Sequence, residues 1–384
     1  MKKVLHVVEA FGGGVFTFLV DLLNAMADEY EVVLACSTRP QTPENYKDYF
    51  DKRIKIIELK YGERSIGYKD VKLYLEIRRI IKEENPDVLH LHSSKAGLFG
   101  RFSVKNGKMK VFYNPHGFSF LMENQGWMHK KIYKLIEKIG SKKCGYIIAC
   151  SKGEYEEALK LSKRAYLINN GIDTKKLPKY ENRIVDKRNL KICTLGRVSY
   201  QKNPKEFNKI AEAFPNIEFT WIGEGELENE LTSPNIKVTG WLEKDKALEI
   251  MNKSDIFILT SLWEGLPIAL LESMYYKKIC MVSNCIGNKD VIKNEVNGFL
   301  CENAEDFINI ITEIIEDKRD IDNIIENAHK DIMENYDFYS VAKKYMYIYE
   351  NSPIKENEKI GLGGSYDNIK SNISLDSNNK KGIL

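Results

Sequence analysis

The sequence predicts an α/β fold built from two Rossmann-like, doubly wound domains. Short apolar segments that resemble strands alternate with amphipathic, helix-like segments along most of the chain. Such alternation produces parallel sheets with helices on both faces. It breaks once, in a charged stretch without periodicity, and then starts again. Glycines also follow the first predicted strand of each half, as in the opening turn of a Rossmann-type unit.

The first domain is expected to cover residues 1–175. It opens with a strand at Lys3–Val8, the run Gly12-Gly13-Gly14, and a helix from Phe16 whose apolar residues recur at helical spacing. Helices are also predicted at 71–81 and 128–139. The remaining strands of this domain are predicted at 30–35, 54–59, 87–92, 110–114 and 146–150.

A linker is predicted at residues 176–189, and a second domain at 190–335. The strands of the second domain are expected at 191–195, 218–222, 236–238, 256–259 and 279–283. A last helix, within 336–350, is expected to pack back on the first domain. Residues 351–384 are polar and hold too little apolar surface to offset the entropy cost of ordering, so we predict a disordered tail.

The composition is that of an ordinary globular protein. Hydrophobic residues make up 43% of the 384 residues and charged residues 29%. The net charge of +3 gives no electrostatic reason to expect a nucleic-acid partner. The seven cysteines form no CxxC pair, and several lie in apolar runs. We therefore expect free thiols in a reducing compartment, with no disulfide and no metal on the cysteines.

The sequence predicts neither a signal peptide nor a transmembrane helix. The apolar run after Lys2 and Lys3 is too short for the hydrophobic region of a signal peptide. No run of about 18 apolar residues occurs, which a membrane crossing would need. We therefore expect a cytoplasmic protein, peripheral at most on the inner face of the cell membrane.

The strongest local signal lies after the predicted strand 256–259. The loop carries Glu264, and Pro267 stands where a helix would begin. Exposed amides at such a helix start bind anions or hydroxyl groups. Glu264 can accept hydrogen bonds from sugar hydroxyls, and Glu272, deeper in the helix, can reach a ribose. The alternative is an acidic helix start that the helix dipole stabilises, but the apolar neighbours of Glu272 favour a binding site.

A second signal follows the first strand of the second domain. Gly196 lets a ligand approach the backbone closely. Arg197 offers a planar fork to phosphate oxygens, and Lys202 offers a point charge. Two cations on one diphosphate would offset the charge of a leaving group without a metal ion. The alternative is a solvated turn that happens to contain basic residues.

Three further patterns are weaker. The run Gly12-Gly13-Gly14 is not the spaced GxGxxG of dinucleotide binding. His116 follows a strand, and although a lone histidine is more often structural, strand carboxyl ends are where such sheets bind ligands. Asp320 and Asp322 have the spacing of a metal-binding pair. They lie between helical segments, however, so we interpret them as a solvated turn.

Taken in this order, the segments resemble glycosyltransferase family 4, the retaining enzymes with the GT-B fold. Glu264 and Glu272 match its signature of two glutamates separated by seven residues, and Gly196, Arg197 and Lys202 match its diphosphate-binding segment. Segments 223–225 and 170–173 are also typical of the family. Segment 90–101 resembles enzymes of bacterial surface-polysaccharide assembly. The resemblance spans Val4–Tyr349 and implies two Rossmann-like domains that face a central cleft.

The resemblance also implies roles for particular residues. Glu264 would hold the donor sugar, with the amides of Gly265 and Leu266 on its hydroxyls and Pro267 in the same turn, and Glu272 would hold the ribose. Gly196, Arg197 and Lys202 would carry the diphosphate.

His116 would face the sugar from the first domain, and the base would lie near Gly240 and Trp241. Gly13 and Gly14 would line the donor phosphates and the acceptor entrance of the first, acceptor-binding domain. Many relatives carry an acidic residue where this chain has Val15-Phe16-Thr17.

The activity implied is that of a retaining hexosyltransferase. It would move a hexose or N-acetylhexosamine from a nucleotide-sugar, most commonly a UDP-sugar, to a glycan or polyprenyl-lipid-linked acceptor in polysaccharide or glycoconjugate biosynthesis. No metal and no cofactor are expected besides this donor. The acceptor would attack the face that the diphosphate leaves, and electrostatic stabilisation of that phosphate would be the main catalytic term.

Three alternatives remain open on sequence alone. A UDP-sugar epimerase or hydrolase of the same fold would not need the paired glutamates. A nicotinamide-dependent oxidoreductase would need the absent GxGxxG and its downstream acid. A non-catalytic partner subunit would be expected to have lost the charged site residues, which are present here.

Segment 127–143 is basic and amphipathic. Ile132, Leu135, Ile136 and Ile139 form one stripe, surrounded by six lysines at positions 130, 131, 134, 138, 142 and 143. Such a helix can lie on a membrane surface that contains anionic lipid. The simpler interpretation, which the sequence favours, is that the stripe packs on the sheet.

Overall fold

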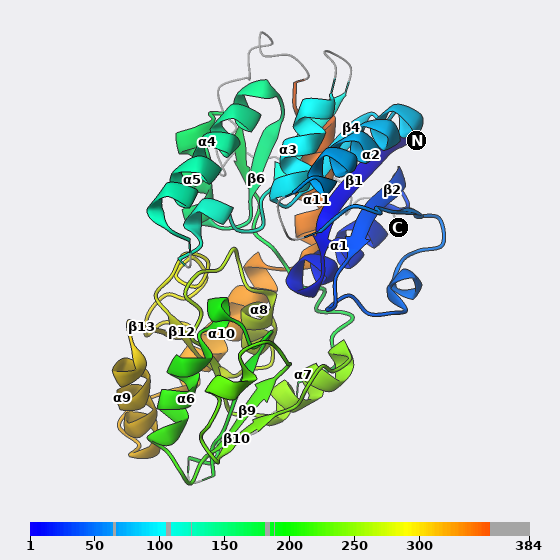
Figure 1. Cartoon of the computed structure of the whole chain (residues 1–384). Coiled ribbons are helices and arrows are strands. Elements are labelled where there is room, and N and C mark those ends of the chain that lie inside the picture. Colours follow the sequence, from blue (N-terminus) through cyan, green and yellow to red (C-terminus); the bar gives the residue numbers. More distant parts are fainter. Residues whose placement is uncertain (64–66, 105–108, 124, 181–184, 188, 354–384) are drawn as a thin grey trace, which may run out of the picture. The chain divides into compact units, whose positions relative to one another are not determined.

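The computed structural model describes residues 1–353 apart from 64–66, 105–108, 124, 181–184 and 188. The chain forms two compact units (Figure 1). The first contains Met1–Phe120, Trp127–Asn170 and the chain from Phe338 onward; the second contains Leu121–Gly126 and Gly171–Asp337. Where the structure describes the predicted linker, 176–189, its residues belong to the second unit. The predicted tail lies outside the described residues from position 354 on.

A parallel sheet forms the centre of the first unit. Its order, in the described residues, is β3-β2-β1-β4-β5-β6-β7, and all neighbouring pairs are parallel. The strands are β1 Lys2–Phe11, β2 Tyr30–Thr38, β3 Lys55–Glu58, β4 Val88–His92, β5 Lys110–Asn114, β6 Tyr146–Ala149 and β7 Ala165–Leu167. The order reverses at β1, so the carboxyl ends of β1 and β4 flank the position where doubly wound sheets bind ligands.

The helices of this unit include one from the far end of the chain. They are α1 Gly13–Met26, α2 Lys69–Glu84, α3 Ser94–Ser103, α4 Trp127–Lys143, α5 Lys152–Leu161 and α11 Phe338–Asn351. Helix α11, orange in Figure 1, lies against α1. Its apolar residues recur every three to four positions, so one face is buried in the core of the first unit, with Phe338, Tyr345 and Tyr349.

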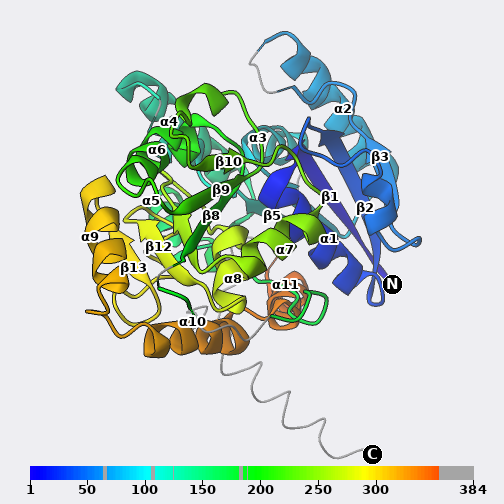
Figure 2. The same ribbon diagram turned by 90° about the horizontal axis from the view of Figure 1, so that it is seen from below.

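The second unit repeats the same strand order. In the described residues its sheet runs β10-β9-β8-β11-β12-β13, all parallel. The strands are β8 Lys191–Leu195, β9 Glu218–Ile222, β10 Ile236–Val238, β11 Ile256–Leu259, β12 Ile279–Ser283 and β13 Phe299–Cys301. The helices are α6 Pro204–Glu212, α7 Lys244–Lys253, α8 Ile268–Tyr275, α9 Ala304–Ile315 and α10 Asp322–Asn335. Helix α9 lies along β13 at one edge of the sheet (Figure 2).

The predicted fold class is confirmed, with two local corrections. The glycine run is not a loop before the helix, because α1 begins at Gly13 with Gly12 as its N-cap residue. Two strands were not predicted, β7 and β13, each of three residues at one edge of its sheet. Such short strands carry no measurable apolar alternation. Among the described residues, none of the helices combines the length and hydropathy that a membrane crossing requires.

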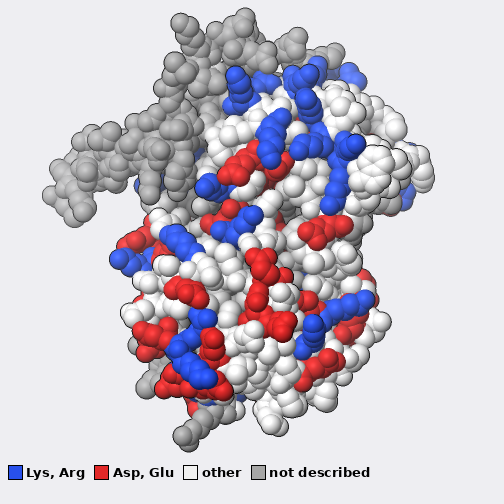
Figure 3. Space-filling view, turned by 90° about the vertical axis from the view of Figure 1, so that its left-hand side faces the viewer, with Lys and Arg blue, Asp and Glu red and all other residues white. Residues whose placement is uncertain are grey.

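Helix α4 carries its apolar stripe on the outside. Ile132, Leu135 and Ile139 are 52%, 57% and 47% exposed, whereas the buried residues of the helix are Glu137, Gly140 and Ser141. The interpretation that this stripe packs on the sheet is therefore wrong for these three residues. Figure 3 views the side of the molecule that carries α4, and lysine and arginine side chains gather there around uncharged surface of the first unit.

A buried ion pair explains why α4 is turned this way. The Arg101 guanidinium on α3 lies 2.9 Å from Glu137 Oε2 and stacks over the Tyr113 ring. The Tyr113 hydroxyl donates to Glu137 Oε1. A Cβ atom at Gly140 would lie 2.6 Å from the Arg101 guanidinium, so any larger residue would have to displace this buried group. Because the polar network occupies the inner face of α4, the apolar stripe faces solvent.

Candidate active site

The predicted donor-site residues follow strand ends of the second unit. Gly196, Arg197 and Lys202 come after β8, and Glu264 comes after β11. These strands are neighbours, and the order of the sheet reverses between them. Carboxyl ends of parallel strands meet at one edge, so the structure brings the two predicted signals together at the switch point of this sheet.

Lys202 and Glu264 form an ion pair at this edge. Lys202 Nζ lies 2.6 Å from Glu264 Oε1, and the two side chains are only 16% and 9% exposed. Several hydrogen bonds join their loops. For example, Leu262 N donates to Gln201 O, the Thr260 hydroxyl donates to Lys202 O, and the Gln201 amide donates to Trp263 O. The interpretation of Lys202 as part of a solvated turn is therefore wrong. The pair offers a cation and a carboxylate side by side, each neutralised by the other.

Arg197 pairs with a different carboxylate. Its Nε lies 2.9 Å from Glu226 Oε2, and both side chains are exposed. Arg197 and Lys202, the two residues predicted to bind phosphate, thus pair with different carboxylates. Exposed ion pairs contribute little free energy, so Arg197 can exchange Glu226 for a phosphate oxygen at small cost.

Glu272 is buried inside α8, on the second turn. Its side chain is 6% exposed and its Oε1 lies 3.2 Å from Nζ of Lys244, the first residue of α7. Pro267 is the N-cap residue of α8, and the first turn of this helix contains no acidic residue. The alternative of an acidic helix start is therefore wrong. Lys244 was not predicted, because only the fold brings the start of α7 to this carboxylate.

Glycines let two loops of this site cross. Gly196 and Gly223 have φ angles of +151° and +134°. A Cβ atom at Gly223 would lie 2.4 Å from the carbonyl oxygen of Gly196, and one at Gly225 would lie 2.2 Å from that of Val198. The segment 223–225 therefore serves backbone packing after β8 and β9, which is the physical reason for its glycines.

Gly240 and Trp241 lie beside this crossing. Gly240 forms a bridge with Gly223 and has a φ angle of +73°. The Trp241 amide is 3.3 Å from Glu224 Oε2, and its indole is exposed. An exposed aromatic ring near the strand ends provides a face on which a nucleobase can stack.

In the first unit, the glycine run leaves the start of α1 open. Gly13 and Gly14 are exposed, and Gly13 has a φ angle of +55°. Nothing lies within 4 Å of the position that a Cβ atom at Gly13 would take. A phosphate or hydroxyl can therefore approach the free amides of this first turn.

His116 follows β5 in a left-handed conformation, with a φ angle of 53°. Its Nε2 lies 3.0 Å from Nδ1 of His92, and its ring packs edge-on against Phe18. Burial lowers the pKa of His116 to about 4, so the ring is neutral at neutral pH.

Asp320 and Asp322 lie apart from these residues and are exposed, Asp320 in the turn before α10 and Asp322 as the first residue of that helix. The Asp320 carboxylate accepts hydrogen bonds from Asp322 N and the Asn323 amide. These bonds hold the start of a helix, as the predicted turn requires.

Comparison with known proteins identifies the family. The family model described as "Glycosyltransferase Family 4" matches residues 12–176, and that described as "Glycosyl transferases group 1" matches residues 174–331. An Escherichia coli UDP-Gal:alpha-D-GlcNAc-diphosphoundecaprenol alpha-1,3-galactosyltransferase is 30% identical over 84% of this chain and 89% of its own length.

The chain belongs to glycosyltransferase family 4. The predicted enzyme class is thus confirmed, and the oxidoreductase alternative is wrong.

A further relative and two solved structures are also similar to this chain. A Campylobacter jejuni N,N'-diacetylbacillosaminyl-diphospho-undecaprenol alpha-1,3-N-acetylgalactosaminyltransferase is 24% identical to this glycosyltransferase over 88% of this chain and 96% of its own. Sucrose-phosphate synthase from Thermosynechococcus elongatus has a TM-score of 0.77 at 14% identity, covering 91% of this chain and 98% of that one. HepE of Anabaena in complex with UDP and glucose has a TM-score of 0.75 at 17% identity, covering 91% and 100%. These structures show the fold.

Proposed function

We propose that this glycosyltransferase transfers a hexose or N-acetylhexosamine, with retention, from a UDP-sugar to a polyprenyl-diphosphate-linked acceptor in polysaccharide or glycoconjugate biosynthesis. The observation that carries the proposal is the buried Lys202–Glu264 pair at the switch point of the second sheet. The names of the E. coli and C. jejuni relatives support the acceptor class. UDP in the HepE complex and in the name of the E. coli relative supports the nucleotide.

On donor binding, each basic residue of the site would exchange its carboxylate partner for a donor oxygen. Diphosphate oxygens would take the place of Glu264 on Lys202 and of Glu226 on Arg197. Sugar hydroxyls would then donate to the released Glu264 carboxylate and accept from the amides of Gly265 and Leu266. Because each charge exchanges one partner for another, neither is left buried and uncompensated.

The nucleoside would bind to neighbouring residues of the second unit. Ribose hydroxyls would donate to Glu272, whose Oε1 lies 3.2 Å from the Lys244 ammonium. The base would stack on Trp241 near Gly240. We propose that Arg197 and Lys202 stabilise the leaving diphosphate without a metal ion, and that this phosphate accepts the proton of the attacking acceptor hydroxyl.

Calorimetry in EDTA tests the donor site. Wild type, Glu272→Ala and the control Glu249→Gln, which changes an exposed glutamate on α7, are titrated with UDP-, GDP- and ADP-sugars. The expected result is binding of UDP-sugars alone, weakened at least tenfold in Glu272→Ala and unchanged in Glu249→Gln. Failure of folded wild type to bind any of the three would contradict the proposed function.

We further propose that α4 holds the enzyme peripherally on an anionic membrane, on its cytoplasmic face. Ile132, Leu135 and Ile139 are exposed in a row that lysines surround. The one glutamate of the helix, Glu137, is buried on Arg101. Of the lysines, Lys134 pairs with Glu157 of α5. An outward apolar stripe flanked by lysines suits insertion among anionic headgroups, at about 1 kcal/mol per lysine near the surface.

Vesicle flotation tests this contact. Wild type is expected to float with phosphatidylglycerol-containing vesicles and to remain unbound with pure phosphatidylcholine. Leu135→Ser with Ile139→Ser should lower the bound fraction severalfold without loss of stability, because both side chains already face water. The matched control is Met333→Ser, an exposed apolar residue of α10 in the second unit. Equal loss in the control and the test variant would rule out a specific role for α4.

A further inference from the structure

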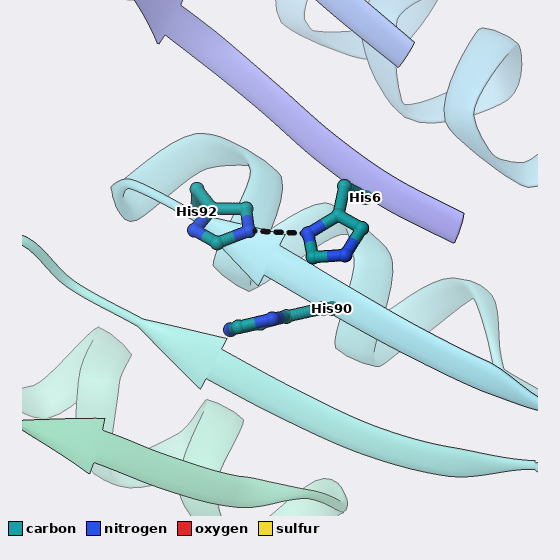
Figure 4. A group of neighbouring side chains, drawn as sticks. All are labelled: His6, His90 and His92. Carbon is teal, nitrogen blue, oxygen red and sulfur yellow. Dashed lines mark hydrogen bonds between the residues drawn. The ribbon is translucent and has the colours of Figure 1, made fainter. Parts of the chain in front are cut away.

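The interior of the first unit contains histidines that the proposed function does not use. His6 lies on β1, and His90 and His92 lie on the neighbouring β4, all fully buried. Figure 4 shows the three rings close together, with a hydrogen bond between His6 and His92. His116, after β5, continues this group.

Three of these rings form a row. His6 Nδ1 lies 3.0 Å from His92 Nε2, and His92 Nδ1 lies 3.0 Å from His116 Nε2. Neighbouring ring centroids are 5.3 Å apart in both pairs, and the ring planes differ by only 11° and 19°. With nitrogens so close at this centroid separation, the rings meet edge to edge in nearly one plane, the geometry of in-line hydrogen bonds.

His90 stands outside the row, although it is close enough to His6 and His92 for the three to be considered as metal ligands. Asn114 Nδ2 donates to Ile148 O, so its Oδ1 faces His90 Nε2, which must carry a hydrogen. The Tyr349 hydroxyl then donates to His90 Nδ1. Because both His90 nitrogens are engaged, a metal bound by all three histidines would have to break these bonds. The contacts favour a hydrogen-bonded row over a metal site.

The row allows only two proton arrangements. Burial lowers the pKa of His6 to about 3 and that of His92 well below its usual value, so each ring is neutral and carries one N–H. Either all three protons lie on Nδ1, or all three lie on Nε2. In the first arrangement His116 presents an Nδ1–H donor; in the second it presents an Nδ1 lone pair.

The inner end of the row decides between them. His6 Nε2 is buried and has no hydrogen-bond partner among the described residues. The Nε2 arrangement would leave an N–H donor stranded there, and buried donors without partners are rarer in proteins than buried acceptors without partners. The Nδ1 arrangement leaves only a lone pair. No described group can deliver a proton to His6 Nε2, so the row cannot conduct protons and instead locks one tautomer.

We propose that His6 and His92 are positioning residues that hold His116 as the Nδ1–H tautomer, so that His116 donates a hydrogen bond to a substrate oxygen and does not act as a general base. The inference rests on the proposed function and on the family resemblance, which implies that His116 faces the donor sugar. It sharpens that function, since a ring with its proton locked on Nδ1 cannot take the acceptor proton. That proton is left to the leaving phosphate.

Long-range ¹H–¹⁵N spectroscopy of the imidazoles tests the lock. Wild-type His116 is expected as the Nδ1–H form. His92→Asn places an amide donor where Nδ1 was and should retain this form, whereas His92→Leu should give a mixture of tautomers. His90→Gln, equally buried but outside the row, should leave His116 unchanged. An Nε2–H form of wild-type His116 would overturn the proposal.

Kinetics and metal analysis complete the test. In His92→Leu, kcat should fall roughly tenfold while the Kd for the UDP-sugar stays within about twofold, because the lost contact acts on the transition state. His92→Asn should recover most of kcat. One equivalent of zinc in purified wild type, bound in place of the His6–His92 hydrogen bond, would overturn the lock in favour of a metal site. Absence of transfer by wild type would refute the proposed function but leave the tautomer measurement valid.

Discussion

The two units share a strand order, yet the residues at their strand ends differ in electrostatic character. The second unit pairs opposite charges, Lys202 with Glu264 and Lys244 with Glu272. The first unit places neutral rings, His92 and His116, in a hydrogen-bonded row. The same strand order thus supports ion pairs in one unit and a row of hydrogen-bonded neutral rings in the other. Exchangeable ion pairs suit a charged diphosphate, whereas locked neutral donors suit uncharged hydroxyls.

The largest expected effect breaks the charged side of this comparison. Lys202→Ala leaves the Glu264 carboxylate, 9% exposed, without its cation. We expect kcat/KM to fall by about 10²–10³ because an electrostatic contact with the leaving group is lost. Steady-state assays should include Lys253→Ala, which removes an exposed lysine paired with Glu249 on α7. Similar losses in both variants would show that the pair has no special role.

A second prediction compares glycines from the two units. Gly223→Ala would place Cβ 2.4 Å from the carbonyl oxygen of Gly196, at a φ angle of +134°, and should cost about 2–4 kcal/mol of unfolding free energy. Gly13→Ala has open space and should cost about 1–2 kcal/mol, from its positive φ angle alone. Denaturant unfolding measures both. Equal costs would mean that the loops near Gly223 can separate.

The neutral side of the comparison predicts acid sensitivity. Burial lowers the pKa of His6 to about 3 and of His116 to about 4, and lowers those of His90 and His92 well below the usual 6.5. Below pH 6.5 the unfolded chain takes up protons that the folded unit does not. The full free energy of unfolding is therefore present above pH 6.5. Below pH 6.5 it decreases as the pH falls, by about 1.4 kcal/mol per pH unit for each histidine.

Two buried carboxyl groups of the same unit act in the opposite direction. Burial raises the pKa of Glu9 and Glu154 above 4.5, so the folded state holds their protons to higher pH and gains stability as pH falls. Four histidines against two glutamates leave a net loss on acidification. Hydrogen exchange of β1 and β4, corrected for intrinsic rates and compared with β8 and β11 from pH 7.5 to 5.5, should show faster opening only in the first unit. His6→Phe should reduce this dependence and His129→Gln, on the exposed side of α4, should not.

The smallest effect concerns Arg197. Glu226→Gln removes its exposed partner. We expect the affinity for a UDP-sugar to change by no more than about threefold, because exposed pairs contribute roughly 0–1 kcal/mol. Calorimetry measures it. A tenfold loss of affinity would mean that Glu226 holds Arg197 in its binding position. Donor binding would then depend on the exposed ion pair as well as on the buried ones.

The sequence was most informative where the signal is local. The strand-end motifs, with Gly196, Arg197, Glu264 and Pro267 at short spacings, predicted both the fold and the loops of the site. Even there the partners were missed. The sequence predicted separate ligands for Lys202 and Glu264 and no role for Lys244. The Lys202–Glu264 and Lys244–Glu272 pairs are separated by 62 and 28 positions, so they follow from strand order and not from sequence spacing.

What the sequence alone determined was therefore the class of elements and the chemistry available at their ends, since periodicity and turn residues act over a few positions. Only the tertiary structure decided which groups meet. The row from His6 to His116 joins β1, β4 and the segment after β5, and its neighbouring members are 86 and 24 positions apart. Likewise, periodicity revealed the stripe on α4 but not the direction it faces. That was set by the buried Arg101–Glu137 pair, because a buried charge must meet its partner while an apolar side chain tolerates exposure.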